Sequence, residues 1–391
     1  MTVIDLRVPS SNFSEYSTIY NKLKINQFLK EHLAPTYFKS GNNGMPWGVW
    51  NPQYQPVGIK KIHRDNMRVV DSTSNPPCTS HYHKDSRAEI HPALAGVKIT
   101  ALIDTTDGCN LRCTFCTRKN SKIEMMSTEK FNILMARIKP YVDTVQLCCA
   151  WEYSIAPNAH EIVDLLGRYQ FTTTSIYTNG QRLPDELAAS IVRAQVTNLV
   201  FSIGESKKET YEKLRIGGKF ETILANIRKM DNLKKSMGSS LPRLCSNLTV
   251  ISSNIEEMVD FVDLAHDVGI DEIRGRHLIL NEGLEVNDER ILDTEHANSI
   301  LAAAGHKAKQ YGMSFNIPCY SNRASSKNCR APWSQIYIAS NGDVSVCPRI
   351  HIYQKIGNIF DSDLDVILSG PELLEFQKQM TIGEFSNPVC G

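Results

Sequence analysis

The sequence predicts an α/β fold in which repeated βα units build a parallel sheet. From Val97 onward, short β-branched or apolar runs alternate with amphipathic stretches of helical period, which is the sequence form of such units. The chain of 391 residues is also long enough for two or three domains with a substantial core. Six strands are expected, at residues 97–103, 144–149, 172–177, 197–202, 246–251 and 271–277.

The first 96 residues differ from the rest because they lack a sustained period and are rich in turn formers. Only residues 16–32 have the spacing of an amphipathic helix, with Ile19, Leu23 and Phe28 available for one apolar face. We therefore expect residues 1–96 to form an N-terminal extension that binds substrate or covers the core as a lid.

Residues 97–290 are expected to form the core domain. Its helices have plausible start signals, such as Ser127 three residues before Lys130 and the acidic turn after Pro184. Six strands are too few to close an eight-stranded barrel. In parallel βα architectures the ligand site lies at the carboxyl ends of the strands, so functional residues are sought in the loops that follow them.

Residues 291–391 are expected to form a small C-terminal α+β domain. A helix over 294–311 leads into two short strands at 335–339 and 343–346. Asn341 and Gly342 lie between these strands, and Asn-Gly between two apolar runs is a strong signal for a β-hairpin.

The charge balance excludes long-range attraction of polyanions. Lys plus Arg total 43 against 42 for Asp plus Glu, a formal net charge of +1, so neither nucleic acid nor an anionic membrane is an expected partner. The N-terminus lacks signal-peptide character and no apolar run approaches about 20 residues, so a cytoplasmic protein is expected. Eleven cysteines in such a chain favour metal ligation or redox chemistry over disulfides.

The most specific motif is Cys109, Cys113 and Cys116, which directly follows the first expected strand. The spacing Cys-x3-Cys-x2-Cys lets one loop present three thiolates to one metal centre, and Gly108 would allow a tight turn at its entrance. Three ligands on a four-iron cluster leave one iron open for chemistry. The alternative, a zinc knuckle, would want a fourth ligand nearby, and residues 117–120 offer none.

This motif, with Phe115 before its last cysteine, resembles the signature of the radical S-adenosylmethionine (radical SAM) superfamily. The resemblance implies a partial (β/α)6 barrel, a 4Fe-4S cluster on the three cysteines, and SAM bound at the open iron. It also implies a one-electron donor such as flavodoxin or ferredoxin, reductive cleavage of SAM to a 5'-deoxyadenosyl radical, and hydrogen abstraction from an unactivated C–H bond.

Other strand ends resemble the SAM-binding runs of the same superfamily. Glu152 matches its acidic position for the methionine amino group, although its neighbours Trp151 and Tyr153 depart from the family pattern. The resemblance assigns Asn179 and Ser202 to the ribose or carboxylate of SAM and Arg215 to the SAM carboxylate. The alternatives are a solvated loop acid for Glu152, turn-forming roles for Asn179 and Ser202, and a surface helix charge for Arg215.

The C-terminal cysteines resemble the opening of the SPASM and twitch extensions, which hold auxiliary 4Fe-4S clusters. Cys329 and Cys347 carry the resemblance, and Cys319 and Cys390 complete a set of four ligands. A full SPASM pattern needs a further Cys-x2-Cys-x5-Cys-x3-Cys group, which this sequence lacks, so one auxiliary cluster is expected. The alternative is that these are ordinary buried thiols.

Three further cysteines lie in or at the ends of expected strands. Cys148 and Cys149 end the second strand, where alternation would point one inward and the other outward, and Cys245 begins the fifth. An inward thiol such as Cys245 would be able to donate a hydrogen atom to a substrate radical. A small core residue is the more common role for such a cysteine.

Together these features predict a radical SAM oxidoreductase. The reaction that the sequence favours is net oxidation of a small metabolite or sugar-like natural-product intermediate, assisted by one auxiliary cluster. The alternatives are epimerisation or cross-linking of a ribosomal peptide and, from a different class, a non-catalytic metal-stabilised scaffold or binding protein.

Overall fold

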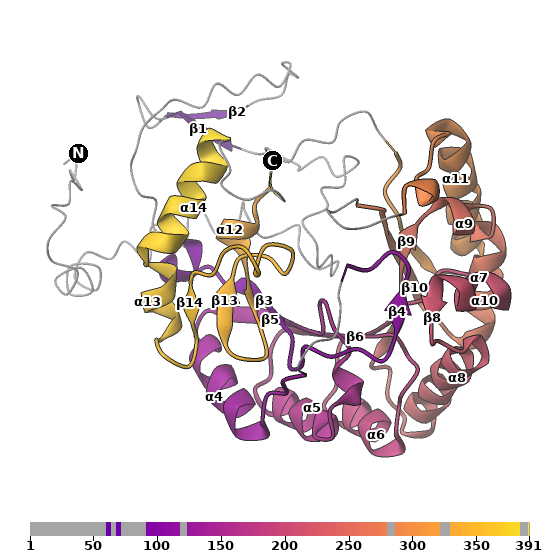
Figure 1. Cartoon of the computed structure of the whole chain (residues 1–391), viewed down its shortest axis with the longest axis horizontal. Coiled ribbons are helices and arrows are strands. Elements are labelled where there is room, and N and C mark those ends of the chain that lie inside the picture. The colour runs from indigo at the N-terminus through magenta and orange to yellow at the C-terminus, as the bar shows by residue number, and fades with distance from the viewer. Residues whose placement is uncertain are drawn as a thin grey trace, which may run out of the picture.

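The computed structural model describes residues 60–63, 68–71, 91–117, 123–279, 286–320, 329–383 and 390. Its centre is a ten-stranded sheet that curves into a partly open barrel, with helices on its convex face (Figure 1). The helix expected at 16–32 lies outside the described residues. Two small sheets accompany the large one, formed by β1 (Lys60–His63) with β2 (Arg68–Asp71) and by β4 (Arg112–Cys113) with β8 (Arg215–Ile216).

All six strands expected in the core are present and lie next to one another in chain order. Each pairs in parallel with the next, which confirms the partial (β/α)6 barrel. They are β3 (Ile99–Ile103), β5 (Val142–Leu147), β6 (Thr173–Thr178), β7 (Asn198–Phe201), β9 (Arg243–Val250) and β10 (Glu272–His277).

Helices cover the convex face because each turns an apolar stripe toward it. In the first one, Phe131, Leu134 and Met135 are fully buried, and the Ser127 side chain caps its start by accepting from the Lys130 amide at 3.2 Å. These core helices are α4 (Thr128–Ile138), α5 (Ala159–Arg168), α6 (Asp185–Arg193), α7 (Lys208–Leu214), α8 (Phe220–Ser236), α9 (Ser252–Ile255) and α10 (Met258–Val268). Short 3-10 helices lie at η1 (Pro92–Ala95), η2 (Tyr153–Ile155) and η3 (Asn287–Glu289).

The two faces of the sheet differ in polarity. Ile103, Leu147 and Ile176 are register partners that belong to the main hydrophobic core under the helices. Side chains alternate along a strand, so their chain neighbours Gln146 and Ser175 lie on the concave face. A closed barrel of this kind fills its interior with branched apolar side chains. The polar interior found here suits an open barrel that receives a polar ligand.

The C-terminal segment extends the same sheet at both edges. The predicted helix is α11 (Thr294–Gln310), and the strand after it, β11 (Ser314–Asn316), pairs in parallel with β10. The predicted hairpin is β12 (Gln335–Ile338) with β13 (Asp343–Ser345), and β12 pairs in parallel with β3. The remaining elements are α12 (Ala331–Ser334), β14 (Gly357–Asn358), α13 (Leu364–Leu368) and α14 (Pro371–Ile382). The domain boundary at residue 290 stays a prediction.

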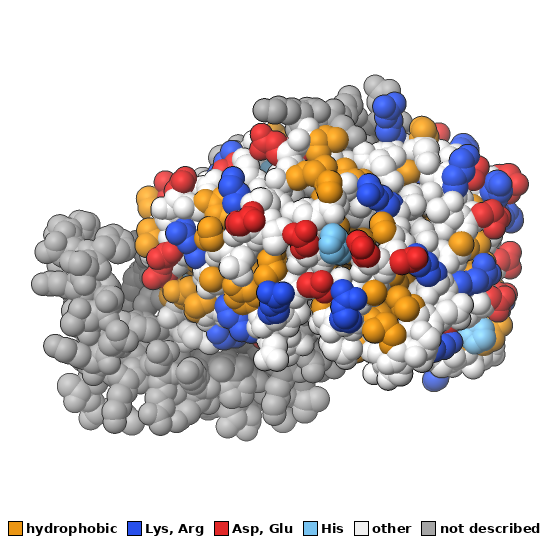
Figure 2. Space-filling model, turned by 90° about the horizontal axis from the view of Figure 1, so that it is seen from below, with side chains coloured by type: hydrophobic (Ala, Val, Ile, Leu, Met, Phe, Trp, Pro, Cys, Tyr) orange, Lys and Arg blue, Asp and Glu red, His pale blue; other side chains and the backbone are white. Residues whose placement is uncertain are grey.

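The helix-covered face carries both signs of charge. Figure 2 shows Lys and Arg side chains interspersed with Asp and Glu over this face, without a large area of one sign. Among the described residues, no helix combines the length and apolarity needed to cross a membrane.

Candidate functional site

The three motif cysteines lie on a loop, residues 104–117, that follows β3; we call it the cluster loop. Its beginning is held by a neighbouring segment, since the Met126 amide donates to the Thr105 carbonyl at 2.8 Å. Gly108 is needed for space rather than for a left-handed turn, because a Cβ there would lie 2.7 Å from Ile155 Cδ1. The expectation of a tight glycine turn is thus replaced by close packing at the same position.

The end of the cluster loop is held by a two-residue β-ladder. Cys113 in β4 pairs with Arg215 in β8, and the Thr114 amide donates to the Leu214 carbonyl at 2.9 Å. The segment that supplies Arg215 therefore fixes the backbone of the cluster loop beside its second cysteine.

The three thiols lie close enough to affect one another's charge. Cys109 and Cys113 are half-buried, and Cys116 is exposed. Burial raises the pKa of Cys109 to about 11, and the nearby charges of Glu152, Cys113 and Cys116 raise it further, against the Leu111 amide, which lowers it. Burial also raises the pKa of Cys113, against the opposing effect of Arg215.

This donor set fits an iron-sulfur cluster. As thiolates the three cysteines would repel one another and the buried carboxylate of Glu152, and a polycationic iron core would remove that repulsion and deprotonate the thiols. The Leu111 amide donates to Cys109 Sγ at 3.4 Å, the kind of contact that tunes a cluster. The described residues contain no group of three His, Cys, Asp or Glu side chains arranged around a single metal ion.

Glu152 is buried against the cluster loop and is not a solvated loop acid. Its amide donates to the Gly108 carbonyl at 2.9 Å. Its carboxylate accepts from the Asn179 amide at 2.6 Å, from Thr178 Oγ1 at 2.9 Å and from the Ser154 amide at 3.2 Å. Burial raises its pKa even so.

Asn179 contacts the cluster loop directly. Its Nδ2 donates to Asn110 Oδ1 at 2.7 Å and lies 3.9 Å from Cys109 Sγ, while its Oδ1 accepts from the Gln181 amide at 3.0 Å. It therefore forms a turn and also faces the cysteines. Ser202 is half-buried at the end of the next strand, and its amide donates to the Thr178 carbonyl at 2.8 Å. Their SAM-binding roles stay predictions.

Arg215 is buried, so its interpretation as a surface helix charge is wrong. It is only 4% exposed and forms an ion pair with buried Glu205, with Nε 3.3 Å from Oε2. Its guanidinium also lies over the Phe115 ring, 5.3 Å from the centroid. Arg215 therefore places a positive charge beneath the cluster loop, while its contact with SAM stays a prediction.

Among the C-terminal cysteines, Cys347 lies within electrostatic reach of Cys329 and Cys390. Burial raises the pKa of Cys347 to about 11, and the nearby charges of Cys329 and Cys390 add to the shift. We call Cys329, Cys347 and Cys390 the auxiliary set. Cys319 is exposed next to β11, where the Pro318 carbonyl lies 2.7 Å from His277 Nε2, and its place in the set stays a prediction.

The remaining cysteines do not follow simple strand alternation. β5 ends at Leu147, and Cys148 adopts a left-handed backbone with φ of 66°, so the inward and outward assignment for Cys148 and Cys149 does not apply. Cys245 is completely buried near the start of β9, five residues before Val250. That distance is about 17 Å along the strand, so Cys245 lies at the end opposite the cluster loop. Its hydrogen-donor role stays an untested prediction.

Comparison with known families agrees with this site. The radical SAM superfamily model matches residues 103–265, and the SPASM model, an iron-sulfur cluster-binding domain, matches residues 329–391. The chain contains a radical SAM domain and a C-terminal SPASM domain. The first implies a 4Fe-4S cluster with SAM, and the second implies auxiliary iron-sulfur binding.

Several known proteins match parts of this chain at low identity. The sporulation killing factor maturation protein SkfB of Bacillus subtilis is 24% identical over 288 residues, which cover 71% of this chain and 67% of SkfB. A probable GTP 3',8-cyclase of Methanocaldococcus jannaschii is 24% identical over 170 residues, covering 43% of this chain and 55% of that protein. The solved structure of Streptococcus suis SuiB bound to precursor peptide SuiA has a TM-score of 0.60 at 15% identity, covering 75% of this chain and 76% of SuiB.

The sequence alone did not identify two acidic residues of the radical SAM domain that contact the site. Glu205 follows the fourth strand and balances Arg215. Asp104 follows β3 and accepts from the Cys149 amide at 2.6 Å and from Tyr337 Oη in β12 at 2.8 Å. Asp104 therefore connects two parts of the molecule, the loop that contains Glu152 and the SPASM domain. Asp104 is the first polar residue after an apolar strand, and this position is the sequence feature that could have identified it as a site residue.

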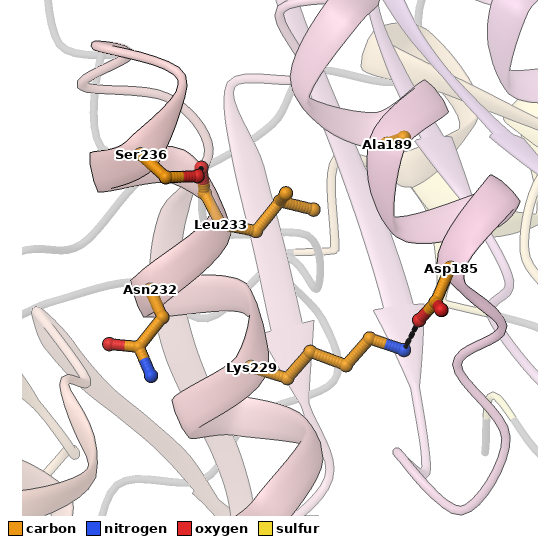
Figure 3. A pocket seen from close by; sticks show the side chains of 6 residues that line it. All are labelled: Asp185, Ala189, Lys229, Asn232, Leu233 and Ser236. Carbon is orange, nitrogen blue, oxygen red and sulfur yellow. Dashed lines mark hydrogen bonds and ion pairs between the residues drawn. The ribbon is translucent and has the colours of Figure 1, made fainter.

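A surface cavity between α6 and α8 lies away from this site. Figure 3 shows Lys229 of α8 reaching toward Asp185 of α6, with Leu233 and Ala189 beside them. Both helices cover the convex face of the sheet (Figure 1), whereas the cluster loop follows the carboxyl end of β3. We assign this cavity no role in the chemistry.

Proposed function

We propose that this protein is a radical SAM enzyme that abstracts hydrogen from a C–H bond of a peptide. The observation that carries the proposal is the extent of the match to SkfB, a maturation protein, which spans 288 residues and therefore includes more than the radical SAM domain. The matches to GTP cyclases cover 45% of this chain or less. The solved neighbour SuiB with its bound precursor peptide has a compatible fold.

The residues of the site would have different roles in cluster binding, SAM binding and support of the cluster loop. Cys109, Cys113 and Cys116 would hold a 4Fe-4S cluster which, when bound with SAM and reduced by a donor such as flavodoxin or ferredoxin, supplies the 5'-deoxyadenosyl radical. Glu152 would accept from the SAM amino group, and Asn179 lies beside Glu152. The buried pair of Arg215 and Glu205 keeps the loop in place, and the polar concave face receives the substrate.

A second candidate is net oxidation of a small metabolite. One auxiliary set of cysteines favours it, because a complete SPASM pattern with two auxiliary clusters is the expectation for many peptide-modifying relatives. The auxiliary cluster would accept the second electron in that reaction.

The test begins with anaerobic reconstitution by iron and sulfide, followed by dithionite and SAM. We expect about eight irons per chain and formation of 5'-deoxyadenosine. Absence of 5'-deoxyadenosine from fully loaded protein would refute the radical enzyme and favour a scaffold.

The substrate class is tested next by anaerobic co-expression with short peptides encoded beside the gene. A mass change in one peptide, absent with Cys113→Ala, is the expected result. Deuterium transfer into 5'-deoxyadenosine from labelled peptide would locate the attacked carbon. Unchanged peptides, with deuterium transfer only from a small alcohol, would instead establish metabolite oxidation.

A further inference from the structure

The side chain of Asn179 lies between the end of β6 and the cluster loop. β6 ends at Thr178, so Asn179 is the first residue after the carboxyl end of that strand. It is only 8% exposed. Its backbone amide donates to Glu152 Oε2 at 2.6 Å, which fixes the point from which the side chain extends. Asn179 therefore reaches the cluster loop from a position that a strand end holds in place.

The orientation of the Asn179 side-chain amide is fixed by its partners. Its Oδ1 accepts from the Gln181 amide at 3.0 Å, and a backbone N–H requires an oxygen at that place. Its Nδ2 must then point the other way, where it donates to Asn110 Oδ1 at 2.7 Å. An amide nitrogen carries two hydrogens, so one remains. Cys109 Sγ, 3.9 Å from Nδ2, is the acceptor for this second hydrogen.

Gln181 is itself held by the segment that supports the cluster loop. Its Nε2 donates to the Lys219 carbonyl at 3.1 Å and to Tyr211 Oη at 3.0 Å, and its Oε1 accepts from the Lys219 amide at 2.8 Å. Lys219 follows β8, the strand that pairs with β4 of the cluster loop. The loops that carry Asn179 and Cys109 are therefore bound to the same segment, which fixes the position of Nδ2 relative to Sγ.

Two N–H donors thus face Cys109 Sγ, because the Leu111 amide lies 3.4 Å from the same sulfur. When a 4Fe-4S cluster gains an electron, negative charge increases on its sulfur ligands, and N–H donors stabilise that charge. Hydrogen bonds to the sulfurs are accordingly among the features that set the reduction potential of such a cluster. The Leu111 donor belongs to the backbone. Asn179 adds a donor that depends on its side chain.

We propose that Asn179 is a positioning residue that acts on the radical SAM cluster through Cys109. Its side-chain amide orients the Cys109 sulfur and raises the reduction potential of the cluster held there. With one hydrogen donated to Asn110 and the other to Cys109, this amide has no hydrogen left for a hydroxyl or carboxylate of SAM. The proposal rests on one point of the proposed function, that Cys109 is a cluster ligand.

The test measures the midpoint potential of each cluster in the reconstituted holoprotein by electron paramagnetic resonance, without SAM. The signal that changes when SAM is added to a second sample belongs to the cluster of Cys109. Asn179→Asp keeps an acceptor for the Gln181 amide and replaces the Nδ2 donor with a carboxylate oxygen. Both changes oppose reduction, so the ratio of reduced to oxidised cluster at a fixed potential should fall about tenfold, or about 60 mV for one electron. The auxiliary cluster should keep its potential.

A second variant removes the partner of the amide rather than the donor. Asn110 is exposed, so Asn110→Ala should fold, and it leaves the Asn179 amide without the acceptor that orients it. We expect a smaller shift in the same direction, about threefold or about 30 mV. Asn232→Ala, at an exposed position of α8 (Figure 3), is the matched control and should leave both potentials unchanged. Iron analysis and melting temperatures show beforehand that each variant is loaded and folded.

Two results would overturn this role of Asn179. In one, loaded Asn179→Asp and Asn110→Ala proteins keep the wild-type potential without SAM, and if only Asn110→Ala loads, its potential decides alone. In the other, the potential shifts only when SAM is bound, which would assign Asn179 to SAM. These potentials are measured without peptide and without SAM cleavage. Failure of the proposed function would appear instead as absence of 5'-deoxyadenosine or of a modified peptide, so the two fail separately.

Discussion

The thiols of the cluster loop come from residues 109–116, whereas those of the auxiliary set come from residues 329, 347 and 390. The cluster loop carries its three thiols within one short segment, and its backbone is held by the pairing of β4 with β8 and by the bond from the Glu152 amide to the Gly108 carbonyl. Cys329 precedes β12 and Cys347 follows β13, so the antiparallel pairing of these two strands brings the two cysteines to one end of the hairpin. One metal site is thus specified by spacing and the other by strand pairing.

The largest expected effect separates the two sites by function. Cys113→Ala removes a ligand of the SAM-binding cluster. Loss of a residue that only supports a metal ligand costs roughly 10- to 100-fold in activity, so loss of the ligand itself should lower SAM cleavage by more than roughly 100-fold. Cys347→Ala should remove about four irons and abolish substrate turnover, yet keep substrate-independent SAM cleavage. Iron analysis and chromatography of 5'-deoxyadenosine measure both.

The interpretation of the auxiliary set depends on the second variant. If folded Cys347→Ala protein lost SAM cleavage as completely as Cys113→Ala, the distinction between an initiating and an auxiliary site would be wrong.

The next effect concerns the contact that fixes the cluster loop. Glu205→Gln leaves buried Arg215 without its ion-pair partner, and breaking such a pair costs about 3–5 kcal/mol of unfolding free energy. Chemical denaturation of the apoprotein measures the loss. Asp185→Asn is the control, because its pair with Lys229 is exposed and should matter little. Equal losses in the two variants would show that Glu205 does not support the loop.

The same contrast explains what could be predicted from sequence. The six strands and the hairpin at Asn341 and Gly342 follow from local periodicity and turn chemistry, and the structure confirms them. The structure also pairs β11 with β10 and β12 with β3. These pairings join residues that are distant in sequence, so no local sequence pattern predicts them. For the same reason, the grouping of Cys319 with Cys347, which the resemblance to the SPASM and twitch extensions implies, stays a prediction.

Residue roles divide in a similar way. Glu152 and Asn179 stand at motif positions, and the structure places both against the cluster loop. Burial of Arg215 was missed because its partner Glu205 follows a different strand. A single residue in a sequence does not reveal the charge that will lie beside it.

A smaller effect tests whether the two sites are coupled through Asp104. Asp104→Asn replaces a carboxylate oxygen with an amide nitrogen and leaves the Cys149 amide or Tyr337 Oη without an acceptor, at a cost of about 1–3 kcal/mol. Tyr337→Phe should cost less, because it removes one neutral donor. If Asp104→Asn also changes the electron paramagnetic resonance signal of both clusters, the sites are coupled. A change confined to one cluster would mean that they are independent.

The smallest difference is expected in thiol reactivity, because the two sites share one electrostatic property. Burial raises the pKa of both Cys109 and Cys347 to about 11, so both thiols are protonated at neutral pH. Raising the pH toward 11 generates thiolate, and alkylation of the apoprotein should accelerate by roughly tenfold per pH unit at both sites. A free thiol with a pKa of about 8.5 would level off sooner. Mass spectrometry after iodoacetamide treatment at several pH values measures each rate. Levelling near pH 9 at Cys109 alone would show that burial at the cluster loop is weaker than at the auxiliary set.

Iron displaces the thiol protons of Cys109 and Cys347 on binding, so cluster loading at both sites should improve as the pH rises.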